Sequence, residues 1–190
     1  MQTQEVINIY MEANPNPNSM KFVANIMLLP AGESLDFPDA ESAKHAPLAK
    51  KLFELPFVDR VFYMSNFVTI TKPEDKEWVE IQNEIKSLIK THLESGEPVL
   101  LPEALQEEEE VEKSPYDEKI MMILDEYIKP AVEGDGGAIT FHSFKDGVVK
   151  VILQGACSGC PSSTVTLKAG IENLLQRMMP EVKKVEAINM

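Results

Sequence analysis

The feature that most constrains this chain is the segment GACSGCPSS at residues 155–163, because it holds both cysteines of the 190 residues. The alternating apolar residues at 148–153 predict a strand directly before it. Residues 162–178 predict an amphipathic helix directly after it. The thiols of Cys157 and Cys160 are therefore expected in a short loop between a strand and a helix.

The helix after the cysteines is expected to pack through one apolar face. Pro161 suits the first turn of a helix, and Ser162 or Ser163 is expected to be its N-cap. The residues expected on the inward face are Leu167, Ile171, Leu174, Leu175 and Met178.

The position of the thiols favours their ionised form. A helix N-terminus stabilises anions, so it lowers the cost of ionising Cys160 in particular. Thiolate is the form of cysteine that binds metals and attacks disulfides. Gly155 and Gly159 allow the backbone to fold closely around whatever the sulfur atoms hold. The loop is expected to offer two thiolates.

Two thiolates leave three chemical outcomes open. They can cycle between dithiol and disulfide, with Cys157 as the attacking thiolate and Cys160 as the resolving thiol. They can share a metal centre with a second copy of the chain, because zinc sites and iron–sulfur clusters take about four ligands. They can also be a buried pair without a role. Thioredoxin-type dithiols often follow an aromatic residue, whereas small residues flank this pair.

A longer stretch around the cysteines resembles a known family. The run GDGG at 134–137, the two strands after it and the sequence LQGACSGCPSSTVTLKAGIENLL are similar to the C-terminal domain of NifU-type proteins, over residues 116–188. That family donates or scaffolds iron–sulfur clusters. The resemblance implies that Cys157 and Cys160 bind a [4Fe–4S] cluster between two subunits. A site that bridges two subunits through short loops should be exposed, so that the thiolates of an acceptor can enter.

The same resemblance implies the partners and the type of activity. A homodimer forms on cluster binding, upstream cluster-assembly proteins supply clusters, and apo iron–sulfur proteins accept them. No substrate is turned over, so we expect a carrier or scaffold rather than an enzyme. A thiol–disulfide oxidoreductase and a zinc-bridged structural dimer are the alternatives.

The N-terminal half predicts a second small domain. The expected elements are strands at 5–11 and 20–29, a helix at 47–54, a hairpin of 58–64 and 67–71, and a longer helix that Pro73 opens. The loop NPNPNS and residues 47–72 resemble the N-terminal domain of Nfu-type proteins. We expect His45 and His92 to be surface residues rather than ligands, and Trp78 to be a packing anchor.

The remaining segments complete the predicted organisation. Residues 95–115 contain four consecutive glutamates and predict an acidic linker, in which residues 99–101 are a small apolar patch able to dock against a domain. The C-terminal domain is expected to have a helix that ends near Lys129-Pro130, a hairpin with an Asp146-Gly147 turn, an exposed His142 that is not a ligand, and a last strand at 182–188. The expected fold class is α+β: two small two-layer α/β domains at 1–94 and 116–190, joined by that linker.

Composition narrows the partners. A net charge of −13 repels phosphate backbones, so we expect no binding to nucleic acid. No apolar run approaches the roughly 20 residues that span a bilayer, so we expect no membrane insertion. Residues 1–5 have neither a basic nor an apolar start, and on that basis the expected location is the cytoplasm.

Overall fold

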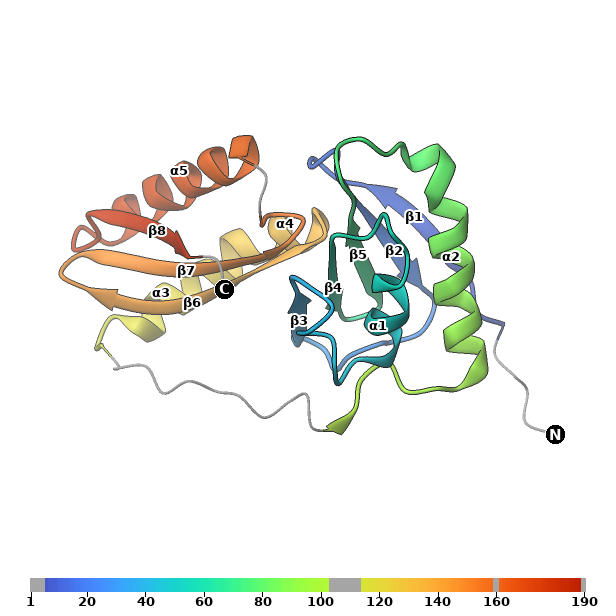
Figure 1. Cartoon of the computed structure of the whole chain (residues 1–190). Helices are drawn as coiled ribbons and strands as arrows, with labels where there is room; N and C mark the ends of the chain where they lie inside the picture. The colour runs from blue at the N-terminus through green and yellow to red at the C-terminus, as the bar shows by residue number, and fades with distance from the viewer. Residues whose placement is uncertain (1–5, 103–113, 159–160, 189–190) are drawn as a thin grey trace. The chain divides into compact units, whose positions relative to one another are not determined.

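The computed structural model describes residues 6–102, 114–158 and 161–188, the side chains of 161–164 excepted. The chain divides into two compact units, residues 1–107 and 108–190, each with its own sheet and its own helices (Figure 1). The predicted α+β class is confirmed.

The first unit is a five-stranded antiparallel sheet with two helices packed on it. The strand order is β1-β2-β5-β4-β3. The apolar core lies between the sheet and the helices. The elements are β1 (Ile9–Ala13), β2 (Ser19–Ala24), β3 (Ser34–Phe37), α1 (Pro47–Phe53), β4 (Arg60–Met64), β5 (Phe67–Thr71) and α2 (Trp78–Ser95).

The predicted β4–β5 hairpin is confirmed, and its turn also decides where β2 ends. Ser65 adopts a positive φ of 47°, which closes the tight Ser65–Asn66 turn. The Ser65 carbonyl accepts hydrogen bonds from the amides of Leu28 at 2.7 Å and Leu29 at 3.0 Å. The strand predicted at 20–29 therefore stops at Ala24, because Leu28 and Leu29 bond to this turn instead of to a neighbouring strand.

Strand β3 was not predicted from the sequence, because its four residues carry too short an apolar pattern. It pairs antiparallel with β4, with Phe37 opposite Val61. A nearly buried ion pair holds the two strands together: Arg60 Nε lies 2.8 Å from Asp36 Oδ1, and a second guanidinium nitrogen contacts Oδ2. Such two-pronged contacts give both geometry and affinity.

Helix α2 begins at Trp78 rather than at Pro73, which lies in the turn before it. Ile81, Ile85 and Ile89 are buried as the helical spacing predicts. The indole Nε1 of Trp78 donates a hydrogen bond to the carbonyl of Pro17 at 2.9 Å. Trp78 therefore anchors the asparagine- and proline-rich loop to the helix.

The expectation for His92 is wrong, because this side chain is only 2% exposed, while His45 is half-buried. His92 Nε2 lies 3.2 Å from the Pro98 carbonyl oxygen, and Nδ1 lies 3.4 Å from Lys51 Nζ. A carbonyl only accepts, so Nε2 carries the proton and Nδ1 accepts from the lysine. This pattern fits a neutral imidazole.

The histidine joins the end of α2 to the segment that follows it. Val99 and Leu100 pack against the core of the first unit. The Leu101 amide donates to the His45 carbonyl at 2.8 Å. Residues 96–101 thus lie on the first unit, and the apolar patch at 99–101 contributes to that contact.

Burial of His92 predicts a loss of stability in mild acid. Burial lowers the pKa of His92, and the neighbouring Lys51 charge lowers it further, while the Pro98 carbonyl and Glu97 act in the opposite direction. The unfolded histidine takes up a proton at about pH 6.5, before the folded one does. Stability is therefore full above about pH 6.5 and falls as the pH drops below it, by at most about 1.4 kcal/mol per pH unit.

The measurement is urea unfolding at about pH 7.5 and about pH 5.5. We expect His92→Gln to remove this part of the pH dependence, because glutamine can still donate to Pro98 but does not titrate. His45→Gln is the matched control and should keep the wild-type difference. An unchanged pH dependence in His92→Gln would contradict the assignment.

The second unit is a three-stranded sheet in the order β6-β7-β8, with β6 and β7 antiparallel and β8 parallel to β7. Its helices and the sheet enclose a separate apolar core. The elements are α3 (Asp117–Ile123), the π-helix η2 (Leu124–Ile128), α4 (Lys129–Gly134), β6 (Gly137–Lys145), β7 (Val148–Gly155), α5 (Pro161–Met178) and β8 (Lys184–Ile188).

The predicted β6–β7 hairpin is confirmed. Asp146 and Gly147 have φ values of 54° and 85°, the two left-handed positions that a tight hairpin turn of this kind requires. A bulge interrupts the register between Phe141 and Ser143. His142 therefore lies at the bulge, half-buried, with Nδ1 3.0 Å from the hydroxyl oxygen of Ser143.

The first helix of this unit does not end near Lys129-Pro130 as predicted. It continues through a π-turn to Gly134, with Pro130 in the first turn of α4. Proline cannot donate a backbone hydrogen bond, and one wider turn before it accommodates this loss. The Lys129 amide donates to the carbonyl of Leu124, five residues earlier.

Helix α5 packs through Ile171, Leu175 and Met179, with Leu167 and Leu174 partly buried. The prediction of Met178 on this face is wrong: Met178 is 39% exposed and Met179 is fully buried. The Met179 amide donates to the Leu175 carbonyl at 2.7 Å, so the helical path extends one residue past Met178. Met179 then follows Leu175 at a spacing of four residues, on the same face.

No described helix in either unit is both long enough and apolar enough to cross a membrane.

Candidate functional site

The candidate site is the turn between β7 and α5 that carries Cys157. Gly155 ends β7 with a φ of 64°, and the Ser158 amide donates to the Gly155 carbonyl at 3.0 Å. Helix α5 begins at Pro161. The predicted order of strand, loop and helix is confirmed, whereas Gly159 and Cys160 lie outside the described residues.

The predicted N-cap is wrong. Since α5 begins at Pro161, Ser162 and Ser163 lie inside its first turn rather than before it. Proline at the first position loses nothing, because an amide there has no partner within the helix.

Cys157 is buried, which contradicts the expectation of an exposed thiol. It is 6% exposed and belongs to the apolar core of the second unit, and its neighbours Ala156 and Ser158 are buried as well. An iron ion or a reagent in solution therefore reaches this sulfur only if the turn changes its conformation.

The glycine run before β6 packs directly against the cysteine turn. Gly136 has a φ of 79°, and its carbonyl accepts from the Ala156 amide at 3.2 Å. Gly137 pairs with Gly155 across the hairpin. A Cβ atom on Gly137 would lie 2.9 Å from Cys157 Sγ and 2.6 Å from the Gln154 carbonyl oxygen, so only glycine fits.

The sequence analysis used this run only for the family resemblance and missed the role of Gly137. The signal was the pair of glycines at the start of a strand, which marks a close approach of another backbone or side chain.

The histidines do not complete a metal site. Across residues 6–102, 114–158 and 161–188, no three or more histidine, cysteine, aspartate or glutamate side chains are grouped so that they could hold a metal ion. If Cys157 binds a metal, the other ligands are therefore not grouped with it in this part of the chain.

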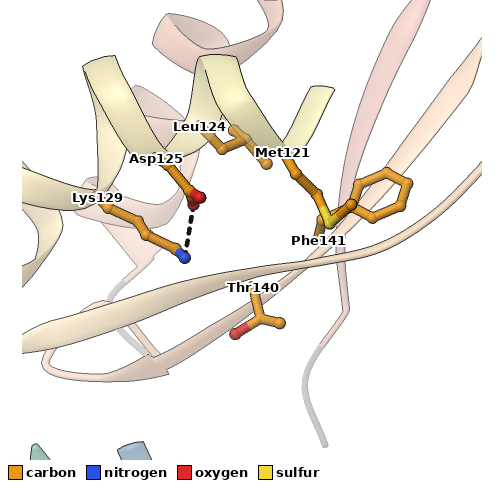
Figure 2. Close-up of a pocket in the computed structure, with 6 residues that line it drawn as sticks. All are labelled: Met121, Leu124, Asp125, Lys129, Thr140 and Phe141. Atoms are coloured by element: carbon orange, nitrogen blue, oxygen red, sulfur yellow. Dashed lines mark ion pairs between the residues drawn. The ribbon is translucent and has the colours of Figure 1, made fainter. Parts of the chain in front are cut away.

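A separate small pocket lies in the second unit between the π-helix and β6. It has a volume of about 100 Å³ and is lined by Met121, Leu124, Asp125, Lys129, Thr140 and Phe141. Figure 2 shows that Asp125 and Lys129 point toward each other, and their charged atoms are 2.6 Å apart. The two charges neutralise one another, which leaves a largely apolar lining.

Comparison with known proteins identifies the family. The model described as scaffold protein Nfu/NifU N terminal matches residues 9–96, and the model described as NifU-like domain matches residues 120–186. The chain belongs to the Nfu/NifU family. The predicted resemblance is thereby confirmed for both halves.

Two curated relatives align with 95% of this chain. The NFU1 iron-sulfur cluster scaffold homolog, mitochondrial, of Drosophila grimshawi is 44% identical over 95% of this chain and 61% of its own length. The protein of the same name from Drosophila persimilis is 43% identical over 95% of this chain and 64% of its own length. This member of the family thus spans less than two thirds of these relatives. The solution structure of a NifU-like protein from Saccharomyces cerevisiae is 27% identical, covers 53% of this chain and 89% of that chain, and has a TM-score of 0.47.

These names correct the expected location. Both Drosophila relatives are named as mitochondrial, which overturns the expectation of a cytoplasmic protein. That expectation depended on residues 1–5. Residues 1–5 do not bear on a targeting segment, because the chain spans only 61% and 64% of the lengths of these relatives.

Proposed function

We propose that this chain is an iron–sulfur cluster scaffold that carries a [4Fe–4S] cluster between two copies of itself and passes it to apo-proteins. The observation that carries the proposal is the Cys-x-x-Cys loop between β7 and α5 in a member of the Nfu/NifU family. Cys157 and Cys160 are the proposed ligands, and the cluster is cargo rather than a resident cofactor. The relatives named as mitochondrial scaffold homologs support the same role and compartment.

The number of ligands supports a homodimer. A [4Fe–4S] cluster takes about four cysteine thiolates, and one chain has two cysteines. Two copies together supply the full set without any ligand from elsewhere.

Transfer follows from shared ligation. A thiolate of the acceptor binds one iron while Cys157 or Cys160 leaves it, so one iron–sulfur bond forms as another breaks. The departing thiolate takes up a proton equivalent to the one that the acceptor thiol lost, and the cluster keeps its iron, sulfide and charge. Since the cluster is passed on unchanged and no substrate is turned over, the proposal describes a carrier and not an enzyme. Upstream assembly proteins load it by the reverse exchange.

The domain limits belong to the proposal too. The cluster domain is 116–190, and the N-terminal domain, 1–94, recognises partners or positions the cluster domain. The acidic segment at 95–115 joins them, and its four consecutive glutamates lie outside the described residues. Its first residues pack on the first unit through Val99 and Leu100.

The test is anaerobic reconstitution of the full chain, with iron, sulfide and zinc counted after separation by size. We expect a brown dimer with about four iron and four sulfide per pair of chains. A colourless, iron-free monomer would overturn the proposal in favour of dithiol chemistry. Zinc in a colourless dimer would make the site structural.

A further inference from the structure

We propose that Gly137 is a positioning residue that lets the Cys157 thiol lie inside the second unit, so that this ligand becomes available only when the turn at 155–158 opens. The role of Cys157 as a ligand rests on the proposed function. The burial of the thiol and the part played by Gly137 rest on geometry alone.

The first step is steric. Gly137 is opposite Gly155 in the hairpin, at the end of β7 where the cysteine turn begins. A Cβ on Gly137 would be 2.6 Å from the Gln154 carbonyl oxygen, 2.9 Å from Cys157 Sγ and 3.3 Å from Cys157 Cβ. The first two separations are shorter than real Cβ contacts, so a side chain at position 137 forces the end of β7 and the cysteine turn to shift. The buried position of Cys157 therefore depends on glycine at position 137.

The second step concerns access to the sulfur. Cys157 is 6% exposed and lies in the same core as Ile139, Leu153 and Ile171. In the closed turn its sulfur is therefore shielded from iron and from reagents in solution, and opening the turn exposes it.

The third step is the opening of the turn. Backbone hydrogen bonds on either side of Cys157 help to hold the turn, among them Ser158 to Gly155 at 3.0 Å and Ala156 to Gly136 at 3.2 Å. The turn is a short segment at the end of β7, so we expect it to open locally while the rest of the second unit stays folded. Between loading events the buried thiol is protected from oxidants.

The experiment measures the reaction of Cys157 with an aromatic disulfide reagent in the full chain carrying Cys160→Ser, without iron. We expect the thiol in the native chain to react at least about tenfold more slowly than the same thiol in the chain unfolded by concentrated urea. Adding Gly137→Ala should accelerate the native reaction at least about tenfold. Gly134→Ala is the matched control, because a Cβ there meets no atom within 4 Å, and it should leave the rate unchanged.

Several results would overturn the inference. A native wild-type rate equal to the unfolded rate would mean that Cys157 is not buried in solution. An unchanged rate in a folded Gly137→Ala chain, with the far-UV spectrum and melting temperature preserved, would remove the role of Gly137.

If Gly137→Ala does not fold, the reaction rate of Cys157 in the Cys160→Ser chain at low urea concentrations distinguishes local opening of the turn from global unfolding. A rate that barely changes with urea supports local opening, whereas one that follows the global unfolding slope contradicts it. None of these readouts involves a cluster. A chain that fails to bind iron can still show the buried thiol, and the two proposals can fail independently.

Discussion

Replacing Cys157 or Cys160 with alanine will reduce the iron and sulfide of the reconstituted protein to background. In a symmetric dimer each single substitution removes two of the four proposed ligands, and two thiolates do not hold a [4Fe–4S] cluster. The chain itself should stay folded. Cys157→Ala deletes one buried sulfur atom, at a cost of about 1 kcal/mol.

The readouts are the visible absorption spectrum, iron and sulfide per chain, and the far-UV spectrum of each variant. Val165→Ala is the matched control, since Val165 lies one turn into α5 and is exposed. It should load as the wild-type chain does. A full complement of iron and sulfide in either cysteine variant would show that the ligand assignment is wrong.

Replacing Met179 with alanine will destabilise the second unit by about 2–5 kcal/mol, because the buried side chain leaves a cavity in the core. Met178→Ala, one residue earlier on the exposed side, should change stability by no more than about 0.5 kcal/mol. The two variants delete the same atoms from neighbouring positions. The comparison therefore separates the effect of burial from that of the atoms removed.

Urea unfolding can assign the effect to one unit. Trp78 is the single tryptophan of the chain and lies in the first unit, so its fluorescence transition should not move. The far-UV signal, to which both units contribute, should show an earlier transition in Met179→Ala. Equal shifts in the two variants, or a shift in the tryptophan transition, would contradict the packing described for α5.

Local patterns were sufficient for much of this molecule. The alternation at 148–153 and the small residues after it correctly predicted a strand followed by a loop at Cys157. Asp146-Gly147 correctly predicted a hairpin turn, because few residue pairs accept two positive φ values. These features depend on interactions between residues close in sequence, which a single sequence displays directly.

Other features depend on contacts between residues far apart in the chain. Strand β3 exists because β4 offers it a pairing edge and Arg60 binds Asp36, neither of which its four residues reveal. His92 is buried because the segment after α2 folds back and places the Pro98 carbonyl beside it. A lone histidine in a sequence carries no sign of such a partner.

The candidate site divides in the same way. The sequence by itself determined the two thiols, their spacing and their place between a strand and a helix, because these are matters of residue identity and local periodicity. Only the tertiary structure decided that Cys157 is buried against Gly137 and that Met179, not Met178, completes the core face of α5. Close packing is the physical reason, since which atoms fill a core is settled by neighbours that fold into contact from elsewhere in the chain.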